Sequence, residues 1–117
     1  MSRDSYSDYS TFQQRKLGNC FYNLAKEKYD LALLTSDVNS NAKAEAYTMS
    51  IINAQCAILF NRNDVEAKEL IKKMCNNSVT VKYTNLSGSN INRILTTEDL
   101  KEIHKLAVTK YRNLGYC

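Results

Sequence analysis

The chain has 117 residues, a net charge of +4, and hydrophobic and charged fractions of 44% and 24%. These values are ordinary for a soluble globular protein. They predict one domain whose hydrophobic core is stable without bound metal or disulfide bonds. No apolar run approaches the roughly 18 residues of a membrane span. The first ten residues also lack the hydrophobic region of a signal peptide. A membrane protein is thereby excluded, and an intracellular, cytoplasmic location is expected.

The first predicted helix covers residues 12–35. Residues 1–11 are rich in Ser, Tyr and Asp without periodicity, so we expect a flexible N-terminal tail, followed by a single helical domain over residues 12–117. Gly18 inside the helix predicts the close approach of a neighbouring helix. The predicted inner face comprises Leu17, Phe21, Leu24, Leu31 and Ala32, with Cys20, Ala25 and Tyr29 beside them.

Residues 41–77 hold the densest apolar surface and predict two helices joined by a polar turn at residues 61–63. Ser40 or Asn41 is the predicted N-cap of the first of these helices. Apolar residues occupy two of its faces, which indicates a central helix with neighbours on both sides. One of these faces is formed by Met49, Ile52, Cys56 and Leu59.

Two residues compete to cap the second helix of this pair. Asn63 followed by Glu66 resembles a capping box, and Asp64 is the alternative cap. The helix is predicted to end at Asn76 and Asn77, because asparagine tolerates the left-handed conformation. Its inward residues are Ala67, Leu70, Ile71 and Met74.

After residue 78 the spacing of the apolar residues changes from the helical period to strict alternation. Val79, Val81 and Tyr83 alternate with polar residues, which predicts a half-buried strand. Residues 86–90 form a predicted loop and residues 91–95 a return strand, and this hairpin needs support from the helices.

The last helix is predicted to begin at Thr96 or Thr97 and to stop at Gly115, with Glu98 and Asp99 in its first turn. The predicted fold class is therefore mainly α: a four-helix array or bundle with a short extended or β-hairpin element between helices three and four.

The residues suited to catalysis or metal binding are few and form no known motif. The cysteines (Cys20, Cys56, Cys75 and Cys117) are widely spaced and are expected as free thiols, three of them on apolar helix faces. The only histidine, His104, has no second histidine or cysteine nearby in sequence, so no metal site is expected. A cysteine-dependent enzyme would need His104 beside a thiol. The adjacent carboxylates of Glu98 and Asp99 do not require a catalytic role, because acidic residues are favoured at a helix N-terminus. An enzyme is thus the weakest hypothesis, and no cofactor is expected.

Positive charge is concentrated near the C-terminus, where residues 78–117 carry six basic against three acidic side chains. A surface able to contact phosphates consists of Lys101, Lys105, Lys110 and Arg112, with Tyr111 among them and Lys82 and Arg93 on the preceding segment. Its affinity for nucleic acid would fall steeply with salt. The alternative is a solvated helix face balanced by Glu98, Asp99 and Glu102.

A second binding surface is the groove between the first three helices, where a peptide docks unless the fourth helix fills it. The residues that suggest a family begin with Leu17, Gly18 and Phe21, followed by residues 29–33. The second set is Asn53, Ala67, Ile71 and Met74. In these positions residues 12 to about 75 resemble a tetratricopeptide-type helical array.

The resemblance implies a peptide-binding function and a set of contact residues. Arg15, Asn19 and Asn53 fall near positions that bind a peptide's C-terminal carboxylate in chaperone-adaptor members of that family. The leading hypothesis is therefore a non-catalytic adaptor that binds a peptide or partner protein, with a homo-oligomeric contact as a further option. The alternative hypothesis is a small basic nucleic-acid-binding regulator that uses the C-terminal helix.

Overall fold

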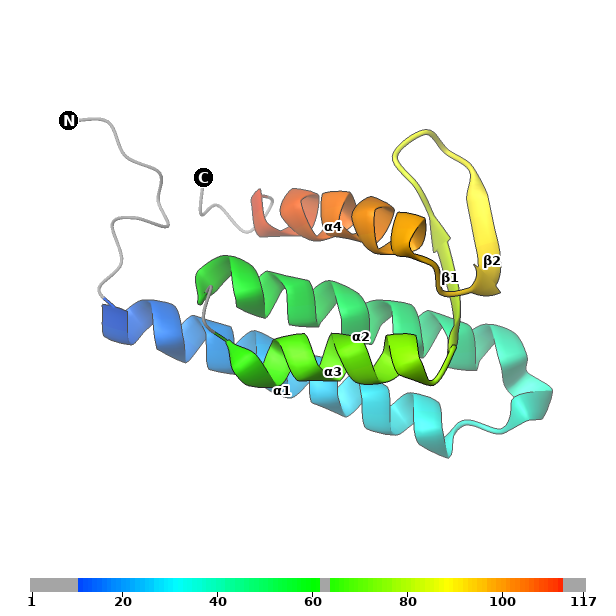
Figure 1. The fold of residues 1–117 in the computed structure, drawn as a ribbon, viewed down its shortest axis with the longest axis horizontal. Helices are drawn as coiled ribbons and strands as arrows, with labels where there is room; N and C mark the ends of the chain where they lie inside the picture. The colour runs from blue at the N-terminus through cyan, green and yellow to red at the C-terminus, as the bar shows by residue number, and fades with distance from the viewer. Residues whose placement is uncertain (1–10, 62–63, 113–117) are drawn as a thin grey trace.

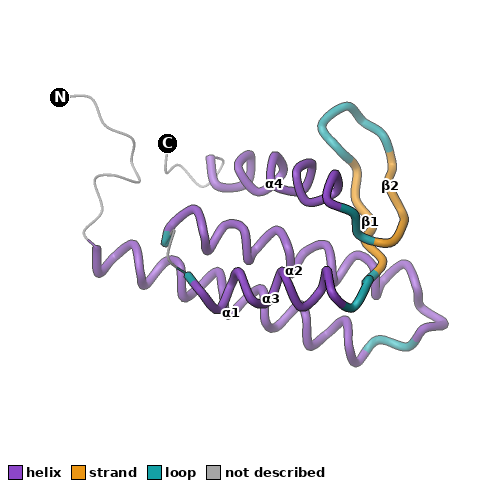
Figure 2. The backbone as a smooth tube through the Cα atoms, in the orientation of Figure 1, coloured by secondary structure: helices purple, strands orange, loops and turns teal. Residues whose placement is uncertain are grey.

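The structure, a computed structural model, describes residues 11–61 and 64–112, and side chains from Arg15 onward. Residues 1–10 of the predicted tail, Arg62 and Asn63 of the predicted turn, and Gly115 and Cys117 lie outside these residues, whereas Thr11 belongs to the first helix. The elements are α1 (Thr11–Leu34), the short 3-10 helix η2 (Asp37–Asn39), α2 (Ser40–Phe60), α3 (Val65–Asn76), β1 (Thr80–Thr84), β2 (Asn90–Ile94) and α4 (Thr97–Tyr111). The predicted fold class is confirmed: the chain is mainly helical, with an antiparallel hairpin between α3 and α4 (Figures 1 and 2). Within the described residues, none of the helices has the length and hydropathy needed to cross a membrane.

α2 is the central helix, as predicted. It contacts α1, α3, α4 and β1, and thirteen of its 21 residues are buried. In Figure 1, α4 lies along one side of α2 and α1 along the other, with α3 in front of them. The largest fully buried apolar side chains are Phe60 and Ile51 from α2, Met74 from α3, Val81 from β1 and Ile103 from α4. Burial of these side chains on both sides of α2 joins the other elements into one core.

α1 packs on α2 through a line of small residues, which corrects part of the predicted inner face. Leu24 and Leu31 were predicted to point inward, but they are 41% and 49% exposed, and Cys20 is exposed as well. Ala25 and Ala32 are buried, as predicted. Each leucine precedes one of these alanines by one residue, so it is turned about 100° away from α2.

Gly18, Ala25 and Ala32 are spaced seven residues apart and allow the two helices to come close together. The Ser50 hydroxyl on α2 donates a hydrogen bond to the carbonyl oxygen of Ala25 at 2.7 Å. A Cβ at Gly18 would lie 3.4 Å from the carbonyl oxygen of Ala57 and 3.3 Å from the Cβ of Asn61. The predicted role of Gly18 in a close helix contact is confirmed.

The helix ends agree with the predicted caps only in part. Asn39 is the N-cap of α2 and makes no side-chain capping bond, so the prediction of Ser40 or Asn41 was wrong. Asp64 caps α3, because its carboxylate accepts the N–H of Ala67 at 3.0 Å. α3 ends at Asn76 as predicted, but the left-handed residue that follows is Ser78 (φ 51°).

The hairpin is attached to α2 along the edge of β1. The Thr48 hydroxyl accepts the N–H of Lys82 at 2.8 Å and donates to the carbonyl oxygen of Ala44 at 2.9 Å. The predicted inward residues Val79, Val81 and Tyr83 are buried. A two-stranded hairpin is marginal alone in water, and this attachment supplies the support that it needs.

Candidate interaction surfaces

The three residues implied by the tetratricopeptide resemblance do not converge on one site. Arg15 and Asn19 are exposed on α1, whereas Asn53 is only 2% exposed on α2. The Asn53 amide nitrogen donates to the carbonyl oxygen of Met49 at 2.9 Å, and its oxygen accepts from Lys110 Nζ at 3.0 Å. Asn53 therefore joins α2 to α4 in the interior, where a peptide carboxylate does not reach it.

Asn19 lines a groove between α1 and α3, which we call the α1–α3 groove. One hollow of about 290 Å³ is lined by Tyr22, Lys26, Tyr29, Glu66, Glu69, Leu70 and Lys73. A second hollow of about 270 Å³ is lined by Asn19, Tyr22, Asn61, Asp64, Val65 and Glu66. The hollows share Tyr22 and Glu66, so they are neighbours on the side of the molecule where α3 runs beside α1 (Figure 1). They lie between α1 and α3, and α4 packs on α2 rather than filling them.

The α1–α3 groove has polar walls around an aromatic centre. Burial, followed by the negative charges of Glu66 and Asp64, raises the pKa of Tyr22, so its phenol stays protonated and can donate a hydrogen bond. Lys73 Nζ lies 5.4 Å from the centroid of the Tyr29 ring, a cation–π distance that holds the lysine at one end of the groove. The groove is therefore acidic near Asp64 and carries positive charge near Tyr29.

The basic surface predicted on the C-terminal helix is only partly assembled. Lys101, Lys105 and Arg112 are exposed, and the helical period places them on the face of α4 opposite its buried residues. Lys110 points inward instead, because its Nζ bonds to Asn53 and lies 5.9 Å from the centroid of the Phe21 ring. Glu102 pairs with Lys105 at 3.1 Å and offsets part of the remaining charge.

The flanking basic residues have acidic partners as well. Lys82 forms an ion pair with Glu45 at 3.4 Å, and Arg93 forms one with Asp99 at 2.7 Å. Tyr111 is buried. The predicted cationic surface therefore reduces to Lys101, Lys105 and Arg112, which we call the α4 cationic face.

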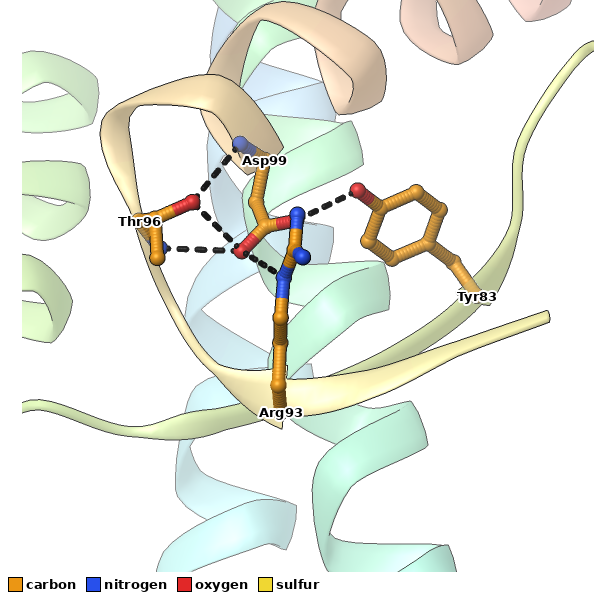
Figure 3. A network of polar contacts seen from close by, with 4 residues as sticks. All are labelled: Tyr83, Arg93, Thr96 and Asp99. Carbon is orange, nitrogen blue, oxygen red and sulfur yellow. Dashed lines mark hydrogen bonds and ion pairs between the residues drawn. The ribbon is translucent and has the colours of Figure 1, made fainter. Parts of the chain in front are cut away.

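Asp99 is the centre of a polar network that the sequence did not predict (Figure 3). Its carboxylate is fully buried and accepts bonds from the Tyr83 hydroxyl at 2.7 Å and from the Arg93 guanidinium at 2.7–3.1 Å. The N–H and hydroxyl of Thr96 donate to the same carboxylate at 3.0 and 2.9 Å, and the Asp99 N–H donates back to the hydroxyl. Both strands of the hairpin and the first turn of α4 are thereby fixed to one side chain.

The network keeps Asp99 ionised. Burial by itself raises the pKa of Asp99, but hydrogen bonds from Arg93, Tyr83 and Thr96 outweigh burial and lower the pKa to about 2. Burial, then the bond to Asp99, raises the pKa of Tyr83. The explanation of Asp99 by a helix N-terminus alone was therefore incomplete: the carboxylate completes a capping box and also binds two strand residues. Because its oxygens are already occupied by these donors, Asp99 is a structural residue rather than a catalytic acid.

The buried thiol of Cys56 is not placed as a nucleophile. The Cys56 sulfhydryl is buried and donates to the carbonyl oxygen of Ala107 at 3.6 Å. Burial raises its pKa to about 11, against the smaller opposing effect of Lys110, so the thiol is protonated and a poor nucleophile. His104 is exposed on α4. In the described part of the chain, no three His, Cys, Asp or Glu side chains are grouped closely enough to hold a metal ion.

No known protein family, curated protein or solved structure matches the chain.

Proposed function

We propose that the protein is a non-catalytic interaction module that binds a peptide segment of a partner protein in the α1–α3 groove. The observation that carries this proposal is that the two hollows are adjacent and share Tyr22 and Glu66. Two adjacent hollows between two helices suit an elongated ligand, which places successive side chains along them.

The size of the hollows favours a peptide over a small metabolite. At about 290 and 270 Å³, each hollow lies just below the range of roughly 300–1,000 Å³ that is typical of small-molecule pockets. Each is better matched to a single side chain of a longer ligand. Tyr22 and Leu70 supply the apolar contact in the first hollow, and exposed Val65 supplies it in the second.

The charges along the groove define the peptide that it prefers. Asp64 and Glu66 attract a basic residue at the Asn19 end. At the Tyr29 end Lys73 attracts an acidic residue, while Lys26 already forms an ion pair with Asp30 at 3.9 Å. An apolar or aromatic side chain between these two charges would pack on the half-buried Tyr22 ring. The proposed ligand is therefore a short segment with a basic residue, an apolar anchor and an acidic residue in that order along the groove.

The test selects random peptides displayed on phage against the immobilised protein and then measures their affinity by fluorescence polarisation. Tyr22→Ala is expected to weaken binding at least about tenfold, because a buried tyrosine at the centre of an interface commonly contributes more than 1 kcal/mol. Glu66→Lys is expected to remove the preference for a basic residue at the Asn19 end.

Glu27→Lys is the matched control for the charge reversal. Glu27 is exposed on α1 and does not line the groove, so its reversal should leave affinity and preference unchanged. Circular dichroism of each variant separates loss of binding from loss of fold. Equal affinities for the wild type and Tyr22→Ala would reject the α1–α3 groove as the binding site.

A second candidate function is nucleic-acid binding, and the observation in its favour is the shared outward direction of Lys101, Lys105 and Arg112. Three phosphate contacts predict a slope of roughly −2 to −3 in a plot of log affinity against log salt. Lys101→Glu with Lys105→Glu should abolish retention on an oligonucleotide column at low salt. Lys68→Glu with Lys72→Glu reverses two exposed lysines with the same spacing on α3 and should have a smaller effect. If the wild type is not retained at low salt, this function is rejected.

A further inference from the structure

The outer edge of β2 carries backbone groups that have no partner among residues 11–61 and 64–112. β1 and β2 form a two-stranded antiparallel sheet in which Lys82 lies opposite Asn92, so one side of β2 faces away from β1 (Figures 1 and 2). Two backbone hydrogen bonds just beyond the ends of the strands show which residues of β2 bond to β1. Leu95 N–H donates to the Val79 carbonyl at 2.8 Å, and Asn85 N–H donates to the Ser89 carbonyl at 3.0 Å.

Bonded and non-bonded pairs alternate along an antiparallel ladder. The odd-numbered residues of β2, Ile91 and Arg93, therefore bond to β1. The N–H and carbonyl groups of Asn90, Asn92 and Ile94 point outward, and among the described residues they make no backbone hydrogen bond. The corresponding edge of β1 is different, because Thr48 on α2 accepts the outward N–H of Lys82.

β2 lacks several of the features that usually prevent an edge strand from pairing. It contains no proline or lysine, and its one-to-one register with β1 has no bulge. Its residues are exposed apart from half-buried Ile91, and Ile94 is 57% exposed. Arg93 is anchored by Asp99, so the strand is held in position for a partner.

We propose that β2 pairs with β2 of a second copy of this chain, antiparallel and about a two-fold axis at Asn92, to form a four-stranded sheet. In this register each outward-facing group meets a complementary group: Asn92 lies opposite Asn92 of the second copy, and Asn90 lies opposite Ile94. A two-fold arrangement of this kind closes after two copies and leaves no further edge on β2.

The charges of β2 favour a second copy over a charged partner strand. Arg93 is the only charged residue of β2, and its counter-ion Asp99 belongs to the same chain. In the proposed register Arg93 lies opposite Ile91 of the second copy, so no like charges are placed directly opposite each other. A strand with acidic residues has no unpaired positive charge on β2 to bind.

The expected dimer is weak, since a pair of five-residue strands buries less surface than a standard protein interface. Sedimentation velocity over roughly 10 μM to 1 mM protein, concentrations that bracket a weak dissociation constant, measures the association directly. The wild type should shift from monomer to dimer within this range.

A proline at the centre of the edge is the discriminating variant. Asn92→Pro removes the outward N–H in both copies but leaves the bonds to β1 intact, because residue 92 does not bond across the hairpin. It should weaken dimerisation at least tenfold. Asn92→Ala is the matched control: it removes the same side chain, keeps the N–H, and should change the dimerisation constant less than threefold.

Amide hydrogen exchange locates the contact independently. The N–H groups of Asn92 and Ile94 should exchange more slowly as the protein concentration rises, while the N–H of Arg93, already bonded to β1, should not change. Unchanged exchange of the β1 amides in Asn92→Pro confirms that the hairpin is intact. A protein that stays monomeric at every concentration overturns the proposal, and so does a dimer that Asn92→Pro does not weaken, since its interface lies elsewhere.

Discussion

Phe60→Ala is expected to lower the free energy of unfolding by about 3–5 kcal/mol, the usual cost of removing a buried phenylalanine ring. Phe60 is buried near the C-terminal end of α2. Its ring stacks on Phe21 of α1 at a centroid distance of 5.5 Å and meets Tyr111 of α4 at 5.0 Å. The substitution therefore leaves a cavity where three helices meet. Urea unfolding followed by circular dichroism measures the loss.

Leu34→Ala is the control for this prediction, because Leu34 is a large apolar residue on the exposed side of α1. Its truncation should cost less than about 0.5 kcal/mol, as is usual for surface positions. If the two variants were equally stable, Phe60 would not lie in the core.

Asp99→Ala is expected to cost about 3 kcal/mol. The change leaves the buried hydroxyl of Tyr83 without its acceptor, at about 1–3 kcal/mol, and removes the capping box of α4, at about 1 kcal/mol. The side chain of Arg93 is 50% exposed, so water solvates its guanidinium after the change and limits that part of the loss. Glu98→Ala changes the neighbouring exposed carboxylate in the same turn and should cost less than about 1 kcal/mol. Similar losses in the two variants would show that the network contributes nothing beyond the helix terminus.

The pKa of Asp99 predicts the acid sensitivity of the fold. The folded pKa of about 2 lies below the ordinary value of 3.8, so the unfolded chain binds this proton more readily. The stabilisation is complete above about pH 4 and is lost as the pH falls towards 2, and its size is about 2 kcal/mol. Asp99→Asn cannot titrate and should show a smaller fall in unfolding free energy over that interval. An identical pH dependence in the wild type and the variant would contradict the assignment.

The order and type of the elements could be predicted because the apolar period along each segment is strong. The change from helical spacing to alternation at Val79 marked the hairpin, and apolar residues on two faces marked α2 as central. The orientation of α1 was harder to predict. A prediction based on hydrophobicity places the leucines of α1 inward. The face of α1 that comes closest to α2 is instead the one with Gly18, Ala25 and Ala32, because small residues let the two backbones approach.

The surfaces could be predicted only in part, since they depend on contacts between residues distant in sequence. Asn19 lines one of the hollows between α1 and α3, but Asn53 and Lys110, which are 57 residues apart, bond to each other in the interior. The capping box of Thr96 and Asp99 is visible as a local spacing of three residues. The attachment of Tyr83 and Arg93 to the same carboxylate depends on where the hairpin lies relative to the first turn of α4, which no local pattern specifies.

The central claim is that a partner peptide occupies the α1–α3 groove, and nuclear magnetic resonance tests it most directly. A peptide selected for binding is titrated into the ¹⁵N-labelled protein, and changes in backbone amide shifts are mapped on the chain. The largest changes are predicted at Asn19, Tyr22 and Lys26 on α1 and at Glu66 and Glu69 on α3. Changes concentrated on α4 or β2, with these five amides unmoved, would contradict the account.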